Sequence, residues 1–277
     1  MQKTFQYKGA SIGYRIEGKG TAVVLIHGFG EDSNIFNEQI NFLKEHCLLI
    51  VPDLPGSGKS ELLVLPETGN MQQATVSIDD YANCIKAMLE QENVSSCMMF
   101  GHSMGGYITL AFAEMYSTQL TAFGLVHSTA FADTDEKKIN RKRGIEIIGK
   151  YGAYPFLKNT IPNLFGKKFK EDFPEKIELL IEASKQFTNE ACQQYYAAMM
   201  NRPDKTNVLK GNLLPVLFVI GTEDVAAPMN DVLQQTHLPD CSYIHVLENV
   251  GHMSMWEATS ELNTYLLNFI QKNESKV

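Results

Sequence analysis

Residues 97 to 107, Cys-Met-Met-Phe-Gly-His-Ser-Met-Gly-Gly-Tyr, decide the fold prediction. The first four are a short apolar run typical of a buried strand, and residues 107–116 read as a helix. Between them, residues 101–105 match G-x-S-x-G, the pattern of a serine on a tight turn from strand to helix. This turn exposes the hydroxyl at a helix N-terminus, where free N–H groups favour developing negative charge. We therefore expect Ser103 to be a nucleophile.

Two later segments supply a base and an acid. A serine hydroxyl reacts only when a base takes its proton, and the base needs an acid to orient it. Asp224 follows the apolar run 216–220, and His252 lies in a loop after the run that ends at Leu247. Open α/β sheets place their ligands beyond the carboxyl ends of such strands. The chain order Ser103, Asp224, His252 differs from the chymotrypsin and subtilisin orders and predicts a triad.

Other side chains compete for these roles. Glu223 adjoins Asp224, and Asp133 follows another predicted strand, so either could orient the histidine instead. His102 stands beside the nucleophile, where we expect local hydrogen bonds to satisfy it. The histidines that we expect to be structural or at the surface are His46, His127, His237 and His245.

Apolar runs recur along the chain with helix-like segments between them, which is typical of a parallel sheet covered by helices. The six runs are 21–27, 47–51, 97–100, 123–126, 216–220 and 243–247. Residues 5–8 and 11–17 alternate apolar with polar around Gly9-Ala10 and predict an antiparallel hairpin at the sheet edge. Helices are expected over 78–92, after a capping box at Ser77, and over 254–272. The prediction is an α/β fold with a mostly parallel sheet of about eight strands and helices on both faces.

The stretch from 131 to 208 interrupts this alternation. It has helical periodicity and many aromatic residues but no convincing strand, so we expect an insertion. The core would then comprise residues 1–130 and 209–277. A basic run from Lys137 to Arg143 accompanies Asp133, Asp135 and Glu136, and this local mixture of charges favours a solvated helix face over an anion-attracting rim.

Together these motifs resemble the α/β-hydrolase superfamily, and the resemblance covers nearly the whole chain. His27-Gly28-Phe29-Gly30 is similar to its oxyanion-strand motif, where His27 is expected to hold the turn. The loop 53–60, and the segments 202–204 and 214–216, are also similar to the superfamily pattern. A proline is usual shortly after the glutamate of the histidine loop, but here Glu257 precedes Ala258-Thr259, so the sequence departs from the superfamily pattern within the expected helix 254–272.

The resemblance implies further roles. The insertion 131–208 would be a helical cap over the active site, and the backbone N–H groups of Phe29 and Met104 would form the oxyanion hole. Proximity to the cap entrance or to the catalytic loops suggests five walls of a substrate pocket: Phe131, Phe156, Met199, Val225 and Met253.

The composition and an incomplete motif argue against other classes of protein. With 24 basic and 32 acidic side chains the net charge is −8, which disfavours nucleic acid and anionic membranes. No run approaches the ~18 apolar residues of a membrane span, and the five cysteines are scattered, so we expect a cytoplasmic protein with reduced thiols. Gly58-Lys59-Ser60 lacks the glycine five residues earlier that a phosphate-binding loop requires. No ligand cluster suggests a metal, and no cofactor is expected.

The expected activity is hydrolysis of a small or medium carboxylic ester or related acyl compound through an acyl-enzyme. The resemblance also leaves open a carbon–carbon bond hydrolase, an enol-lactonase or an elimination enzyme with the same triad. Those would need an inward-facing cation for a substrate carboxylate, for which Arg141, Arg143 and Arg202 are the candidates. A ligand-binding sensor on the same fold is a third reading, because function resides in the site.

Overall fold

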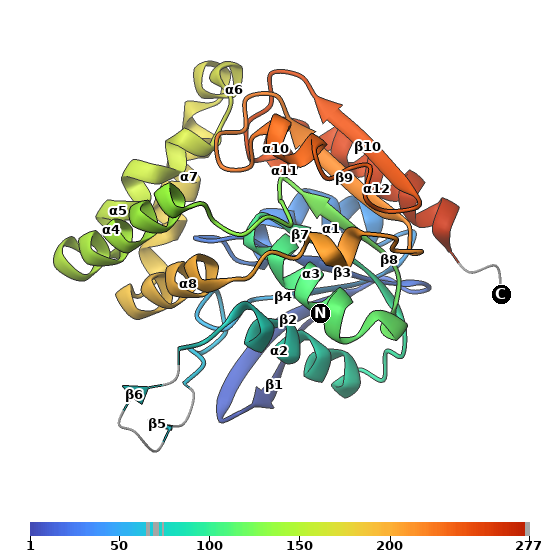
Figure 1. Ribbon diagram of the computed structural model, residues 1–277, viewed down its shortest axis with the longest axis horizontal. Helices are drawn as coiled ribbons and strands as arrows, with labels where there is room; N and C mark the ends of the chain where they lie inside the picture. Colours follow the sequence, from blue (N-terminus) through green and yellow to red (C-terminus); the bar gives the residue numbers. More distant parts are fainter. Residues whose placement is uncertain (65–66, 69–71, 74, 275–277) are drawn as a thin grey trace.

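The computed structural model describes residues 1–64, 67–68, 72–73 and 75–274. Its main sheet has eight strands in the order β1-β2-β4-β3-β7-β8-β9-β10 (Figure 1). The strands are β1 Gln2–Tyr7, β2 Ala10–Glu17, β3 Ala22–Ile26, β4 Leu48–Pro52, β7 Cys97–His102, β8 Leu120–Val126, β9 Val216–Gly221 and β10 Ser242–Leu247. A separate antiparallel pair joins β5 Glu67–Thr68 to β6 Gln72–Gln73. The predicted fold class is confirmed.

Strand direction follows the sequence patterns. The pairs from β4 through β3, β7, β8 and β9 to β10 are all parallel. The hairpin β1–β2 and the pair β2–β4 are antiparallel, with Phe5 opposite Ile12. Lys8 and Gly9 both have positive φ, of 47° and 84°, which suits the two-residue turn between β1 and β2. The expected edge hairpin is therefore present.

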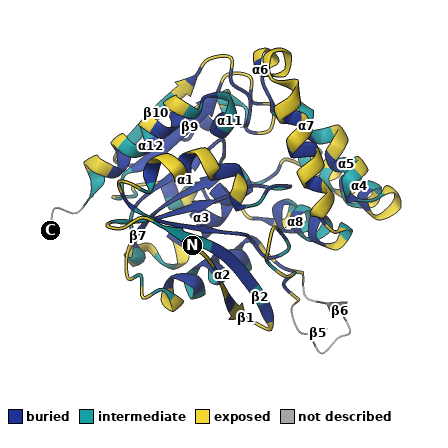
Figure 2. Ribbon diagram, turned by 180° about the vertical axis from the view of Figure 1, so that it is seen from behind, coloured by how far each residue is buried: buried dark blue, intermediate teal, exposed yellow. Residues whose placement is uncertain are grey.

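Helices cover both faces of the sheet, and alternate residues of β3 point to different faces. Val24 and Ile26 pack with α2 (Ile78–Gln91) and α3 (Met104–Met115). Val23 and Leu25 pack with α1 (Asn37–Leu43) and α12 (Thr259–Asn273). Figure 2 shows buried strands between helices whose outer faces are exposed. The capping box at Ser77 is present, with Asp80 as its partner.

The sequence predicts one continuous C-terminal helix over 254–272, but the structure has two helices there. The chain divides into α11 (Ser254–Glu257) and α12, because Ala258 between them has φ −141° and ψ 52°. The Glu257 carboxylate turns back and accepts hydrogen bonds from the N–H groups of Gly251 and Met253, at 3.0 and 2.9 Å. The break therefore lies where the proline that is usual in the superfamily is missing.

Between β8 and β9 the chain is helical, as expected, and no strand occurs among residues 131–208, all of which are described. The helices are α4 Asp135–Tyr151, α5 Ala153–Thr160, α6 Lys167–Asp172, α7 Pro174–Ala183, α8 Asn189–Asn201 and α9 Thr206–Leu209, with 3-10 turns η3 Ile161–Leu164 and η4 Ser184–Gln186. Helices α4, α5, α7 and α8 gather to one side of the sheet (Figure 1). The ends of this segment meet, since the Lys205 N–H donates to the Ala130 carbonyl at 2.8 Å.

Shorter elements complete the fold: η1 Ser33–Phe36, η2 Ser117–Gln119 and α10 Met229–Leu233. The division into a core and a cap stays a prediction. Residues 65–66, 69–71, 74 and 275–277, which belong to the predicted core, lie outside the described residues. Within the described part, no helix is both long and apolar enough to cross a bilayer.

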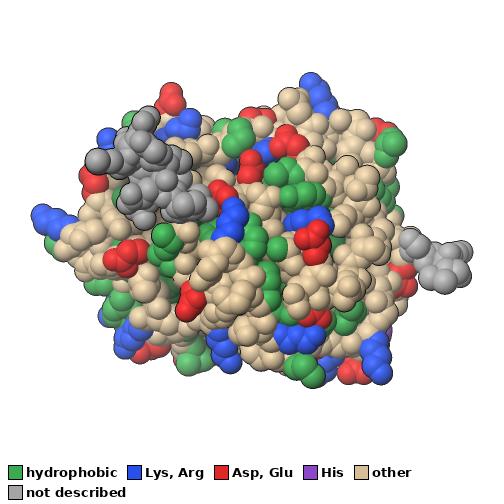
Figure 3. Space-filling model, turned by 90° about the horizontal axis from the view of Figure 1, so that it is seen from below, with side chains coloured by type: hydrophobic (Ala, Val, Ile, Leu, Met, Phe, Trp, Pro, Cys, Tyr) green, Lys and Arg blue, Asp and Glu red, His purple; other side chains and the backbone are tan. Residues whose placement is uncertain are grey.

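The distribution of surface charge and the state of the cysteines are relevant to the predicted partners and compartment. Acidic and basic side chains are interspersed on the face seen in Figure 3. Lys205, for example, contacts Asp79 and Glu114. All five cysteines are free thiols, and four of them are buried, the exception being Cys241.

Candidate active site

Ser103 lies on the turn from β7 to α3, with φ 52° and ψ −115°. A positive φ is uncommon for any residue except glycine and costs about 1–3 kcal/mol, so surrounding contacts must hold the turn. The Ser103 N–H donates to the Val126 carbonyl at 3.0 Å. The Ser128 hydroxyl donates to the Ser103 carbonyl at 2.7 Å. The strained turn that the G-x-S-x-G pattern predicts is present.

Two glycines of this motif are required by close backbone approach. A Cβ on Gly101 would lie 2.1 Å from the carbonyl oxygen of Gly105. A Cβ on Gly105 would lie 2.2 Å from the carbonyl oxygen of Ile26, in the neighbouring strand β3. The turn therefore packs directly on the end of β3, which carries the expected oxyanion segment.

The segment after β3 lies against the nucleophile. A Cβ on Gly28 would be 3.0 Å from the Cβ of Ser103. Among the described residues, none accepts a hydrogen bond from the N–H of Phe29 or of Met104. Two free backbone donors thus belong to the turns that meet at Ser103, as an oxyanion hole requires. His27 holds its turn as expected, because its Nε2 accepts from the Leu54 N–H at 2.9 Å.

The structure brings Asp224 and His252 together, although 28 residues separate them. Asp224 Oδ2 lies 2.8 Å from His252 Nδ1, and both residues are buried. Asp224 Oδ1 accepts the N–H groups of Ala226 and Ala227 at 2.8 and 2.9 Å. Burial opposes ionisation, but His252 and the hydrogen-bond donors lower the pKa of Asp224 well below its usual range. Asp224 is therefore an ionised acceptor that orients His252.

His252 leaves its other ring nitrogen available. Nδ1 is occupied by Asp224, and no described residue forms a hydrogen bond with Nε2 or with the Ser103 hydroxyl. The imidazole of His102, which adjoins Ser103, has its ring centroid 4.8 Å from that of His252. Catalytic hydrogen bonds are often long before substrate binds. The free Nε2 is the atom that could take a proton.

The competing acids have other partners. Glu223 Oε2 accepts the Lys167 N–H at 2.6 Å. Asp133 contacts Arg141 Nε and forms an ion pair of 2.8 Å with Arg202 Nη1. Neither carboxylate forms a hydrogen bond with His252, which favours Asp224 as the orienting acid.

His102, beside the nucleophile, and Glu31, beside the oxyanion segment, form a buried pair. His102 Nδ1 lies 3.0 Å from Glu31 Oε2, and that oxygen also accepts the Gly28 N–H at 2.9 Å. Burial opposes charge on both, but their attraction raises the pKa of His102 and lowers that of Glu31. The expectation of local hydrogen bonds for His102 is wrong. Its partners are distant in sequence because three loops converge here.

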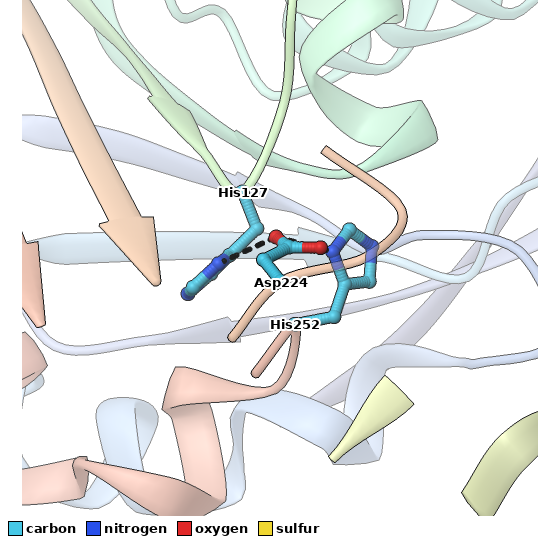
Figure 4. A group of neighbouring side chains, drawn as sticks. All are labelled: His127, Asp224 and His252. Atoms are coloured by element: carbon cyan, nitrogen blue, oxygen red, sulfur yellow. Dashed lines mark hydrogen bonds and ion pairs between the residues drawn. The ribbon is translucent and has the colours of Figure 1, made fainter. Parts of the chain in front are cut away.

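A second imidazole contacts the same carboxylate. His127 Nδ1 lies 3.0 Å from Asp224 Oδ2, so His127 and His252 lie on either side of Asp224 (Figure 4). His127 is buried and follows β8 directly, so it is not at the surface. The sequence signal for this position was its place after a buried strand, at the edge of the sheet where Asp224 also lies.

These three side chains also form the one group with metal-ligand spacing among the residues that the structure describes, their ligand atoms lying within 4.8 Å. Hydrogen bonds explain both short nitrogen–oxygen distances without an ion. The absence of a metal or other cofactor stays a prediction.

The five predicted pocket walls lie in different surroundings. Phe131 and Phe156 are half-buried, and Met199 and Met253 are buried. The side chain of Val225 is exposed, at 67%. Phe156 packs edge-on against Tyr196, whose ring centroid is 4.5 Å from that of Phe29. This aromatic group connects a predicted wall with the oxyanion segment, and the five remain predictions.

A cavity of about 200 Å³ adjoins the oxyanion segment, and none of the five predicted walls lines it. It lies between the loop 30–32 and helix α7, and its lining includes Gly30, Glu31, Leu180, Phe187 and Trp256. The sequence did not reveal it, because the opposing walls are about 150 residues apart in the chain, as the bond from Gln186 to Asp32 (154 residues apart) illustrates.

Comparison with known proteins bears on the family. Residues 19–258 match the family described as serine aminopeptidase, S33. The 2-hydroxy-6-oxo-6-phenylhexa-2,4-dienoate hydrolase of Burkholderia cepacia is 24% identical, covering 96% of this chain and 94% of that protein.

Solved structures are also similar. A thermophilic esterase from Thermogutta terrifontis has a TM-score of 0.87 at 24% identity, over 98% of this chain and 97% of that chain. The enol-lactonase from Burkholderia xenovorans has a TM-score of 0.86 at 19% identity, over 97% and 100%. At these identities the structural likeness concerns the fold.

Proposed function

We propose that this chain, which belongs to the serine aminopeptidase S33 family of α/β hydrolases, is a cofactor-independent serine hydrolase of carboxylic esters or related acyl compounds. The observation that carries the proposal is the 2.8 Å contact between Asp224 and His252, whose ring centroid lies 4.8 Å from that of His102, the residue before the strained turn of Ser103. A buried acid that orients an imidazole with a free Nε2 next to a serine is the arrangement that activates a hydroxyl.

In the first half of the reaction, the Ser103 oxygen attacks the substrate carbonyl carbon while its proton passes to His252 Nε2. The carbonyl oxygen becomes an oxyanion, which accepts hydrogen bonds from the Phe29 and Met104 N–H groups. The tetrahedral intermediate then collapses. The bond to the leaving alcohol breaks as His252 returns the proton to it, and the acyl group stays on Ser103.

In the second half, water attacks the acyl carbon and gives its proton to His252. Collapse of the second intermediate breaks the bond to the Ser103 oxygen, which regains the proton, and the carboxylic acid leaves. Asp224 keeps its charge throughout and stabilises the imidazolium that forms in each half. Its lowered pKa supports that role.

The substrate is proposed to be small or medium-sized. The cavity of about 200 Å³ beside Gly30 and Glu31 is lined by neither Ser103 nor His252, so hydrolysis of an acyl-chain series, and not this volume, measures the size of the substrate. The five free thiols suit a reducing compartment, and we propose a cytoplasmic location.

The test is hydrolysis of p-nitrophenyl esters from acetate to long acyl chains, with wild type and Ser103→Ala side by side. We expect turnover by the wild type, with its optimum at short or medium chains, and none by the folded variant. Equal turnover by Ser103→Ala would overturn the proposal. A single acylation of Ser103 without further turnover would instead favour a ligand-binding sensor.

A second candidate is a hydrolase or lactonase whose substrate carries a carboxylate, and the Asp133 cluster favours it. Arg141 and Arg202 face inward, whereas Arg143 is exposed. The two guanidinium groups share one carboxylate, so the three side chains together carry one excess positive charge.

Of the two inward arginines, Arg141 is the one able to act on a ligand. Arg202 is committed to the fold, because it donates to the carbonyls of Met199 and Phe131 and stacks on Tyr107 at 3.8 Å. Arg141 lies over the ring of Tyr196 at 5.3 Å, in the aromatic group that includes Phe29.

This candidate is tested with 2-hydroxy-6-oxo-6-phenylhexa-2,4-dienoate, the compound for which the Burkholderia cepacia relative is named, and with an enol-lactone. If Arg141 binds the substrate carboxylate, Arg141→Gln raises KM for the acid but leaves KM for a neutral ester unchanged. Equal effects on both substrates would rule the candidate out.

A further inference from the structure

The Asp224 carboxylate accepts more hydrogen bonds than the proposed triad needs. Two backbone N–H groups donate to Oδ1, while Oδ2 lies 2.8 Å from His252 Nδ1 and 3.0 Å from His127 Nδ1. Each imidazole approaches the same oxygen with the same ring nitrogen, Nδ1. The base of the triad therefore shares its acceptor with a second histidine from another loop.

His127 is held in this place at a conformational cost. Its φ is 51°, which is unfavourable for a residue with a Cβ. Its N–H donates to the Val219 carbonyl at 2.9 Å, which fixes the backbone beyond β8. A Cβ on Gly221, at the end of β9, would lie 2.2 Å from the Gly251 carbonyl oxygen and 3.1 Å from His127 Cε1, so the histidine loop and the His127 ring both approach this glycine. The surrounding chain is shaped to place an imidazole here.

The proton on His127 can be assigned from its surroundings. Burial lowers the pKa of His127 to about 4 despite the attraction of Asp224, so the ring is neutral near pH 7. A neutral imidazole carries one N–H, and the contact with a carboxylate requires it at Nδ1. Nε2 is then an acceptor, and it is buried without a partner among the described residues. His127 therefore serves Asp224 as a single neutral donor.

We propose that His127 is a positioning residue that shares Asp224 Oδ2 with His252 and thereby limits how strongly Asp224 stabilises the imidazolium form of His252. This inference rests on the proposed function of Asp224 and His252. An acceptor oxygen that already receives one N–H is a weaker partner for the second, so His127 reduces the stabilisation that Asp224 gives to imidazolium. Removal of the His127 donor should then strengthen the hydrogen bond between Asp224 and the His252 imidazolium, which a titration of His252 detects.

Other titratable groups near His252 are retained in every variant at residue 127. The pair of His102 and Glu31 reaches it through the 2.9 Å contact of His102 Nε2 with the His252 carbonyl. Glu257 accepts N–H groups of the same loop, and burial raises its pKa. Both acids remain in every variant, so a difference in the pKa of His252 reports the donor at residue 127.

The experiment compares His127→Asn with His127→Leu. Asparagine tolerates positive φ and carries an N–H donor at the δ position, where His127 has Nδ1, whereas leucine has a similar size and no donor. The pKa of His252 is measured in each folded protein by NMR titration of isotope-labelled histidine. His127→Leu should raise that pKa by about one pH unit, and His127→Asn should retain the wild-type value.

The same variants are compared in the pH profile of kcat/KM for the best p-nitrophenyl ester. The acidic limb of the profile should shift to higher pH in His127→Leu, with KM little changed. An unchanged pKa of His252 in His127→Leu, or an equal rise in both variants, would overturn the proposal. Because the NMR titration needs no turnover, failure of this inference is distinguishable from failure of the proposed hydrolase activity, which Ser103→Ala tests. Thermal unfolding of each variant verifies that the titrated protein is folded.

Discussion

The Nε2 atom of His102 lies 2.9 Å from the carbonyl oxygen of His252, so the residue before the nucleophile holds the loop that carries the base. The other ring nitrogen of His102 contacts Glu31, which in turn accepts the Gly28 N–H. One buried ion pair thus connects the nucleophile turn, the histidine loop and the oxyanion segment.

Loss of the Glu31 charge should destabilise the protein and lower activity. Removal of one partner from a buried ion pair typically costs about 3–5 kcal/mol, and Glu31→Gln retains the shape of the side chain, so we expect a loss of about 3 kcal/mol. Denaturant unfolding measures this loss. An unchanged midpoint would contradict the role of the pair.

The effect of Glu31→Gln should depend on pH. The raised pKa of His102 gives stability that is present below its ordinary value of 6.5 and is lost as pH rises through the folded value. The lowered pKa of Glu31 gives stability that is present above its ordinary value of 4.5 and is lost as pH falls through the folded value. The difference between wild type and variant should therefore be largest between these ordinary values. Unfolding curves across the range measure it.

His127 should make the wild type less stable in acid. Its pKa falls from 6.5 to about 4 on folding, so the unfolded chain binds more protons in this range. The corresponding stability is present above pH 6.5 and is lost as pH falls, by about 3 kcal/mol at pH 4. His127→Asn should not lose this part of its stability between pH 6.5 and pH 4. Unfolding of both proteins at these two pH values measures the difference. Parallel curves for the two proteins would be the contrary result.

The acid of the triad can be tested by a matched pair of neighbours. Asp224→Asn should lower kcat by about 10³- to 10⁴-fold, because the amide cannot stabilise imidazolium and favours the wrong tautomer. Glu223→Gln should retain most activity, since Glu223 accepts only the Lys167 N–H in the described structure. Steady-state kinetics of both variants decide between them, and the reverse pattern would move the acid to Glu223.

Gly105→Ala should prevent the turn at Ser103 from forming. Its new Cβ would lie 2.2 Å from the Ile26 carbonyl, which is backbone and cannot move aside, so we expect a loss of about 3 kcal/mol or more. Gly149→Ala is the control, because there the nearest atom is the flexible end of Gln193 and alanine favours the helix by about 1 kcal/mol. Thermal unfolding compares the two, and equal melting temperatures would refute the steric argument.

Local patterns were sufficient to predict the strands, the hairpin and the turn at Ser103. The G-x-S-x-G motif specifies its own backbone, and chain order pairs Asp224 with His252. The contacts of His127 with Asp224 and of His102 with Glu31 join residues 97 and 71 positions apart, which no local pattern encodes. His127 was therefore expected to be structural or at the surface, and the break at Ala258 depends on the carboxylate of Glu257 turning back.

The central claim is that Ser103 is the nucleophile. Its most direct test is to treat the native protein with a fluorophosphonate, which reacts with activated serines, and to locate the adduct by peptide mass spectrometry. We predict one adduct, on Ser103, and none on folded Ser103→Ala. An adduct on another residue, or none on the folded wild type, would contradict the account.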